Sequence, residues 1–178
     1  YWNYFEQKSK LIPVLNCLTL GRLTGGISIT QQRAAHFLFT KPVLQFGKIP
    51  LMRCDDINRF ASLQDIDQAN VRIVENAGGT NAMFARKTIK HAKIIIVNSN
   101  QATIQYLLKR QADVMFTDNI EAHYREKIIP GLCVNKSIPL LTRNYKAYML
   151  PRKSSQFLKR VNAWLQRQQS IHLLKKAT

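Results

Sequence analysis

Acidic residues are scarce in this chain, and nearly all of them lie in one stretch. Ten Asp and Glu stand against 27 Lys and Arg, so the formal net charge is +17. Nine of the ten acids lie between Asp55 and Glu126, where nine Lys and Arg balance them. The remainder of the chain holds 18 Lys and Arg and a single acid, Glu6. This segregation predicts that the two ends of the chain fold together as one unit and the middle as another.

Cysteine and histidine are also few, and their spacing excludes the usual structural metal sites. The cysteines Cys17, Cys54 and Cys133 include no closely spaced pair, and the four histidines are scattered. We therefore expect no metal ion and assign no metal ligand. Two interpretations stay open for Cys54 and Cys133. They form a bridge that closes the central segment in an oxidising compartment, or they are two unconnected thiols, which the spacing alone favours.

Long apolar runs and nucleic-acid-binding motifs are absent. No apolar run approaches the length of a membrane-spanning helix, and the first residues lack the basic start and cleavage site of a signal peptide, so we expect no membrane insertion. Without zinc-finger spacing, an RNP-like aromatic run or a block of Arg and Lys, the basic surface indicates general solubility and weak attraction to anions, with no specific nucleic-acid partner. The 178 residues, 46% of them hydrophobic, suffice for one domain or two small lobes.

Strand-like and helix-like patterns alternate from residue 71 onward. We predict strands at 71–75, 93–97 and 113–117 and helices at 81–91, 101–110 and 121–127, with Asn100 as an N-cap. A run of this kind is typical of an α/β fold with a parallel sheet. Open α/β sheets bind ligands at the carboxyl ends of their strands, where residues 78–80 and 117–118 fall.

The segments that flank this run show different patterns. Pro42 and Pro50 disfavour a helix and indicate an extended connection over 39–50. After the run we predict a strand at 147–150. A helix is predicted to follow it, with one apolar face formed by Phe157, Val161, Trp164 and Leu165.

The chain crosses twice between its basic ends and its neutral middle. We place these crossings near 41–50 and 142–146 and expect them to act as hinges. The expected lobes are 1–45 with 144–178, and 46–143. This is the layout of a clamp that closes over a ligand.

Residues 25–33, Gly-Gly-Ile-Ser-Ile-Thr-Gln-Gln-Arg, predict a site for a small anionic ligand. The guanidinium of Arg33 matches a carboxylate bidentately, and the hydroxyls of Ser28 and Thr30 can complete its hydrogen bonding. Two further polar stretches, residues 78–81 and 117–121, are expected to outline the same site.

Seven stretches carry a resemblance to a known family: 25–42, 53–54, 63–67, 78–81, 112–121, 132–133 and 146–151. Taken in order, they resemble the periplasmic cyclohexadienyl dehydratases, which are similar to the type 2 amino-acid-binding proteins of ABC transporters. The resemblance covers most of residues 25–169 and implies an α/β fold of two lobes that clamp a ligand, with parallel and mixed sheets. Because the family has a longer N-terminal segment, we expect the first lobe to be incomplete at its N-terminus, and we assign residues 1–24 no role.

The resemblance implies roles for the residues that would hold the substrate. Arg33 would bind the substrate carboxylate, with Ser28 and Thr30 as neighbouring donors. Thr80 and Asn81 open a helix whose backbone amides would hold the same anion.

The resemblance also implies the residues of the chemistry. Asp118 matches the acid that binds the α-amino group in the amino-acid-binding relatives. Glu121 would be the general acid, since burial in a closed cleft raises the pKa of a carboxyl group towards a useful range. The implied reaction is the decarboxylative dehydration of prephenate to phenylpyruvate, of arogenate to phenylalanine, or of both, and it requires neither a metal nor an organic cofactor.

Three interpretations of function stay open. The first is this lyase, with a small anionic substrate and, by resemblance, a periplasmic location. The second is a solute-binding protein that delivers an amino acid or organic acid to an ABC transporter permease. The third is an incomplete clamp without function. The choice between prephenate and arogenate and the oligomeric state are left open.

Overall fold

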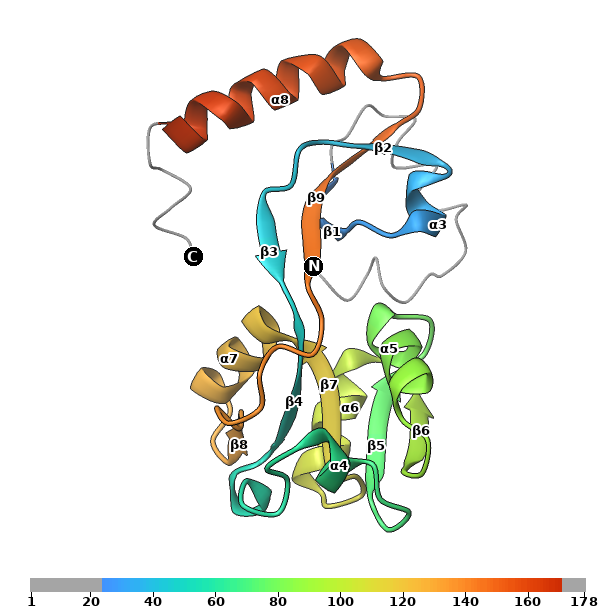
Figure 1. Ribbon diagram of the computed structural model, residues 1–178, viewed down its shortest axis with the longest axis vertical. Helices are drawn as coiled ribbons and strands as arrows, with labels where there is room; N and C mark the ends of the chain where they lie inside the picture. The colour runs from blue at the N-terminus through green and yellow to red at the C-terminus, as the bar shows by residue number, and fades with distance from the viewer. Residues whose placement is uncertain (1–23, 171–178) are drawn as a thin grey trace. The chain divides into compact units, whose positions relative to one another are not determined.

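The protein is described by a computed structural model over residues 24–170 (Figure 1). These residues form two compact units. One, the central unit, contains Gly47–Arg143, and the other, the terminal unit, contains residues 24–46 and 144–170. No described helix is long and apolar enough to cross a membrane.

The central unit is built on a mixed five-stranded sheet. Strand β5 runs parallel to β6 and β7, whereas β4 runs antiparallel to β7 and β8. The predicted parallel arrangement is therefore confirmed for β5, β6 and β7, and β4 adds an antiparallel strand next to them. The order across the sheet is β6 (Lys93–Val97), β5 (Arg72–Asn76), β7 (Val114–Asp118), β4 (Lys48–Arg53) and β8 (Leu132–Cys133).

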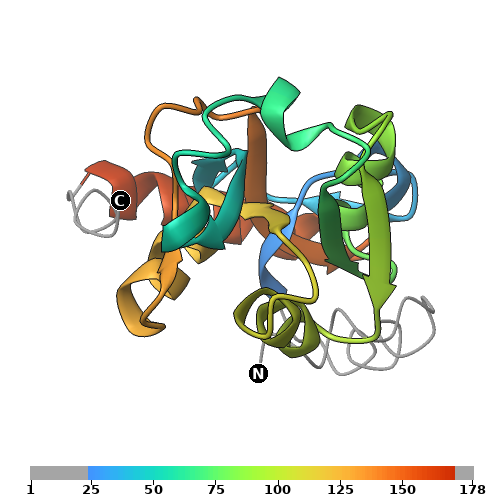
Figure 2. The ribbon, with the colours of Figure 1, turned by 90° about the horizontal axis from the view of Figure 1, so that it is seen from below.

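Helices cover both faces of this sheet, because the strands carry apolar side chains on both faces and the helices bury them. One core cluster contains Leu107 of α6 and Ala122 of α7, and the other contains Ile66 of α4 and Ala85 of α5. In Figure 2, α6 (yellow-green) and α4 (blue-green) lie on opposite sides of the strands. The helices are the short 3-10 helix η1 (Cys54–Asp56), α4 (Leu63–Ile66), α5 (Thr80–Thr88), α6 (Asn100–Leu108) and α7 (Asn119–Ile128).

The ends of α5, α6 and α7 lie one to three residues from the predicted ones, and two of these differences have a local cause. Ser99, and not Asn100, is the N-cap of α6, and its side chain accepts the backbone N–H of Ala102 at 3.1 Å. Asn100 is the first helical residue. Helix α5 ends at Thr88, before the predicted end at residue 91, because the carboxylate of Asp67 accepts the backbone N–H groups of residues 90–92 outside any helix.

The terminal unit is arranged around one long strand. β9 (Asn144–Pro151) pairs antiparallel with β1, β2 and β3, so it extends beyond the predicted 147–150. The remaining elements are β1 (Thr24–Ser28), α3 (Gln31–Ala34), β2 (Phe37–Phe39), β3 (Leu44–Phe46) and α8 (Ser155–Ser170).

Helix α8 has a narrower buried face than its sequence predicts. Val161 and Leu165 are buried, but Phe157 and Trp164 are 44% and 45% exposed. Asn162 fixes the helix within its unit, since its Oδ1 accepts the backbone N–H of Lys41 at 2.8 Å. Only half of the predicted apolar face therefore contributes to the core.

A disulfide joins Cys54 to Cys133, which are 79 residues apart in the sequence. It lies where β4 meets β8, with Met52 registered against Cys133. The neighbouring Arg53 is buried and donates to the carbonyls of Leu107 and Ala112 at 2.7 and 2.6 Å. The bridge and the arginine both hold the first half of the central unit to its second half.

We predict that replacing Cys54 and Cys133 together by serine lowers the free energy of unfolding by about 2–4 kcal/mol, because the bridge restricts the unfolded chain over a long loop. Urea unfolding measures the loss. In reductant the wild type should fall to the level of the variant. Non-reducing peptide mapping should recover the two cysteine peptides joined, and free alkylation of both thiols would contradict the bridge.

Candidate functional site

One cation of the central unit, Lys48, is the first residue of β4 and is only 3% exposed. Its ammonium donates to Oδ1 of Asp118 at 2.6 Å, to Oγ1 of Thr80 at 3.1 Å and to Oδ1 of Asn81. Three of the residues predicted from sequence thus meet at one lysine, which the sequence analysis did not select. We call these four residues the Lys48 cluster.

The register of the sheet explains why the lysine meets the aspartate. Lys48 and Asp118 are partners on the antiparallel strands β4 and β7, although 70 residues separate them. Gly47 precedes the lysine at a point where a Cβ would lie 2.2 Å from the carbonyl oxygen of Thr142, so no larger residue fits. The backbone N–H of Gly47 donates to Oδ1 of Asn119 at 3.1 Å, and its carbonyl accepts the N–H of Asn119 at 2.9 Å. The start of α7 is therefore fixed beside the Lys48 cluster.

The glycine pair at residues 78–79 brings the start of α5 to the cluster. Gly78 has a φ of 74°, a conformation that glycine adopts without strain. At Gly79, the N-cap of α5, a Cβ would lie 3.0 Å from Oδ1 of the buried Asn76. The tight turn lets Thr80 and Asn81 turn their side-chain oxygens towards Lys48. The predicted pattern of two glycines before Thr80 therefore has a packing reason.

Glu121 lies in the first turn of α7, three residues after Asp118. Its Oε2 accepts the hydroxyl of Thr117 at 2.9 Å, and its Oε1 pairs with the guanidinium of Arg125 at 3.3 Å. The side chain is 34% exposed, so this carboxyl group is held by two donors and still reaches solvent.

A second carboxyl group, which the sequence analysis missed, is completely buried. Glu75 in β5 has no exposed surface. Its Oε1 accepts the backbone N–H of Phe116 at 2.7 Å, while no described residue donates to its Oε2. Burial raises the pKa of Glu75 to about 8, opposed by the Phe116 hydrogen bond and the charge of Lys48 and assisted by the charge of Glu121. At neutral pH this side chain is therefore mostly protonated.

The other predicted residues form a group in the terminal unit. Arg33 donates from Nη1 to the carbonyl of Ser28 at 2.9 Å, and Thr30 caps α3 by accepting the backbone N–H of Arg33 at 3.2 Å. Lys146, another buried lysine that the sequence analysis did not select, lies with its Nζ 3.4 Å from Oγ of Ser28 and 4.5 Å from the ring centre of Phe46. Two cations and two hydroxyls are thus gathered in this unit.

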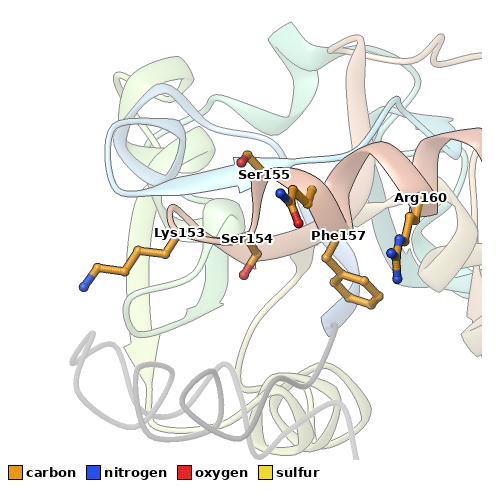
Figure 3. Close-up of a pocket in the computed structure, with 6 residues that line it drawn as sticks. Lys153, Ser154, Ser155, Phe157 and Arg160 are labelled. Carbon is orange, nitrogen blue, oxygen red and sulfur yellow. The ribbon is translucent and has the colours of Figure 1, made fainter.

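A cavity of about 420 Å³ lies elsewhere in the terminal unit, at the start of α8 (Figure 3). None of its lining side chains is buried, and none belongs to the residues predicted to bind substrate. We therefore do not place the chemistry there. Its lining residues are Lys153, Ser154, Ser155, Gln156, Phe157 and Arg160.

Comparison with known proteins defines the class of the fold. No protein-family model matches the chain. The structure is similar to an amino acid ABC transporter substrate-binding protein from Streptococcus pneumoniae bound to L-arginine, with a TM-score of 0.80 and 18% identity over 92% of this chain and 69% of that one. The fold is that of the two-lobed type 2 periplasmic binding proteins, which confirms the predicted fold class.

Two closer relatives define the family. An ancestral cyclohexadienyl dehydratase of known structure is 35% identical, with a TM-score of 0.52 and coverage of 93% of this chain and 70% of that one. A cyclohexadienyl dehydratase from Pseudomonas aeruginosa is 38% identical over 140 residues, which are 79% of this chain and 52% of that protein. The chain belongs to the cyclohexadienyl dehydratase family, and it spans about half the length of this curated relative.

We predict that Lys48→Met lowers the free energy of unfolding by about 3 kcal/mol, because the largely buried Asp118 then loses its ion pair with the ammonium of Lys48. Adding Asp118→Asn should recover part of the loss. Denaturant unfolding at neutral pH gives the free energy of unfolding of the wild type, of Lys48→Met and of the double variant. Lys87→Met, at an exposed lysine of α5, is the matched control, and an equal loss in that control would contradict the prediction.

We predict a pH-dependent stability from Glu75. Its pKa is higher in the folded than in the unfolded chain, so between the ordinary value of 4.5 and about 8 the folded protein holds a proton that the unfolded chain releases. Stability therefore falls as the pH rises through this window, by up to about 1.4 kcal/mol per pH unit. In Glu75→Gln, which keeps an acceptor for Phe116, this fall should disappear. Urea unfolding across this range tests it, and a difference between the two proteins that does not change with pH would contradict it.

Proposed function

We propose that the chain has the activity of a cyclohexadienyl dehydratase, with decarboxylative dehydration of prephenate to phenylpyruvate as its main reaction and of arogenate to phenylalanine as a related one. The observation that carries the proposal is the Lys48 cluster with Glu121 beside it. It supplies a fixed cation and a carboxyl group at the carboxyl end of β7, where ligands of such sheets bind.

In this proposal Glu121 delivers the proton. The ring hydroxyl of prephenate takes that proton and leaves as water, while the bond to the ring carboxylate breaks and its electrons form the aromatic ring. The carboxylate leaves as carbon dioxide, and Glu121 regains a proton from solvent, which its partial exposure permits. Thr117 orients the carboxyl group by its hydrogen bond to Oε2.

Lys48 is proposed to attract and orient the anionic substrate. Its ammonium already pairs with Asp118, which by resemblance matches the acid that binds an α-amino group in amino-acid-binding proteins. A substrate ammonium would have to compete with Lys48 for this carboxylate. A keto acid has no ammonium group to compete for Asp118, so the Lys48–Asp118 pair favours prephenate over arogenate and over amino acids.

Arg33, Ser28 and Thr30 of the terminal unit are proposed to bind the substrate carboxylate. The guanidinium offers paired donors that match a carboxylate, and the two hydroxyls add further donors. Lys146 adds a second cation beside Ser28, which suits a substrate with two carboxylates.

The alternative is a solute-binding protein that delivers an organic acid or amino acid to an ABC transporter permease. The likeness of the fold to an arginine-bound transporter protein supports it. Under both proposals we place the protein in the periplasm, and the Cys54–Cys133 bridge supports an oxidising compartment.

Incubation with prephenate, with phenylpyruvate formation followed against a buffer blank, tests the activity. We expect turnover by the wild type and a loss of at least about 100-fold in kcat for Glu121→Gln, because the amide cannot donate the proton. The Glu121→Gln variant should still bind ligand, so phenylpyruvate should raise its melting temperature as it does for the wild type.

Glu126→Gln is the matched control, since it makes the same change on the same helix and keeps an acceptor for the backbone N–H of Val134. It should retain turnover. Ligand stabilisation without turnover in the wild type would favour the solute-binding protein. The absence of both effects would reject both functions for this chain.

A further inference from the structure

Glu75 stands out because neither the fold nor the proposed reaction accounts for its carboxyl group. It occupies a position in β5 between Val74, which belongs to one core cluster, and Asn76. Among the described residues, only one of its oxygens has a partner, the N–H of Phe116. A buried polar atom without a hydrogen bond destabilises the fold by about 1–3 kcal/mol, and such atoms call for a functional explanation.

Glu75 lies beside the proposed site, because its Oε1 accepts the N–H of Phe116 on β7, two residues before Asp118, which is the register partner of Lys48. Lys48 on β4 interacts favourably with its ionised form, and Glu121 on α7 unfavourably. The backbone N–H of Phe116 on β7 also favours the ionised form. A proton gained or lost at Glu75 is therefore felt at Lys48 and Glu121 together.

We propose that Glu75 is a positioning residue that sets the charge of the Lys48 cluster: while its carboxyl is neutral, the cluster admits an anionic substrate beside Lys48, and when it ionises, the cluster repels that substrate. This inference rests on the proposed function for the identity of the substrate. The electrostatic link between Glu75 and Lys48 does not depend on it.

The physical reason lies in the balance of charges. With Glu75 protonated, the cluster holds one cation, Lys48, and one carboxylate, Asp118, so it presents little net charge to an incoming anion. Ionisation of Glu75 adds a second carboxylate that no solvent screens, because the side chain is fully buried. The cluster then carries a net negative charge, which repels an anionic substrate. Glu75 thus limits substrate binding at alkaline pH.

A double-mutant cycle tests the electrostatic link without any ligand. Unfolding constants are measured for the wild type, Glu75→Gln, Lys48→Gln and the double variant at about pH 6.5 and about pH 9. We expect Lys48→Gln to change the unfolding constant by the same factor in both backgrounds at the lower pH. At the higher pH the factor should be about tenfold larger with Glu75 present, because an ionised Glu75 then pairs with Lys48. Equal factors at both pH values would overturn the proposal.

Phenylpyruvate binding tests the effect of Glu75 on an anionic ligand. This test needs only the isosteric variant Glu75→Gln, so it remains valid even if Lys48→Gln does not fold. Titration calorimetry should give a Kd for the wild type that rises about tenfold from pH 6.5 to pH 9. For Glu75→Gln the change over the same range should stay below about twofold, and Glu126→Gln should behave as the wild type. A similar rise in wild type and Glu75→Gln would overturn the role of Glu75 in binding.

The two proposals fail in different ways. If wild type does not bind phenylpyruvate or turn over prephenate at any pH, the proposed function fails and the cycle alone decides the link between Glu75 and Lys48. If prephenate is turned over and the rate falls at alkaline pH in the same way in wild type and Glu75→Gln, the proposed activity is supported and Glu75 is a packing residue.

Discussion

The buried ammonium of Lys48 is the interaction on which the arrangement of the proposed site depends. A lysine that is removed from water must be paired and hydrogen-bonded, or the folded state is destabilised by several kcal/mol. Three oxygens meet this requirement, and they come from the end of β7 and the start of α5. The need to pair one cation thus brings the ends of separate elements to the same point.

The surrounding backbone fixes this point. Gly47 has no space for a side chain and exchanges hydrogen bonds with Asn119, so the end of β7 and the start of α7 follow the position of β4. The Cys54–Cys133 bridge holds the opposite end of β4 to β8. Strand β4 is therefore fixed at both ends, and the carboxyl groups of Asp118 and Glu121 inherit their positions from it.

Periodicity predicted much of the central unit, and local competition explains where it failed. The apolar runs at β5, β6 and β7 are strongly patterned, and their parallel pairing follows from the helices between them. Ser99 and Asn100 are both good N-caps, so sequence alone could not choose between them. The early end of α5 depends on Asp67, and its carboxylate reaches residues 90–92 only after folding. Phe157 and Trp164 follow helical spacing, but the spacing does not say how wide the buried face of α8 is.

Local patterns and motifs are enough to predict the α/β class, the family and the candidates Arg33, Thr80, Asn81, Asp118 and Glu121. Lys48 and Glu75 became candidates through the folded structure. A lysine before an apolar strand and a glutamate within one look like ordinary surface residues in the sequence. Their burial and pairing depend on strand register across tens of residues, and that register is decided when the whole sheet packs.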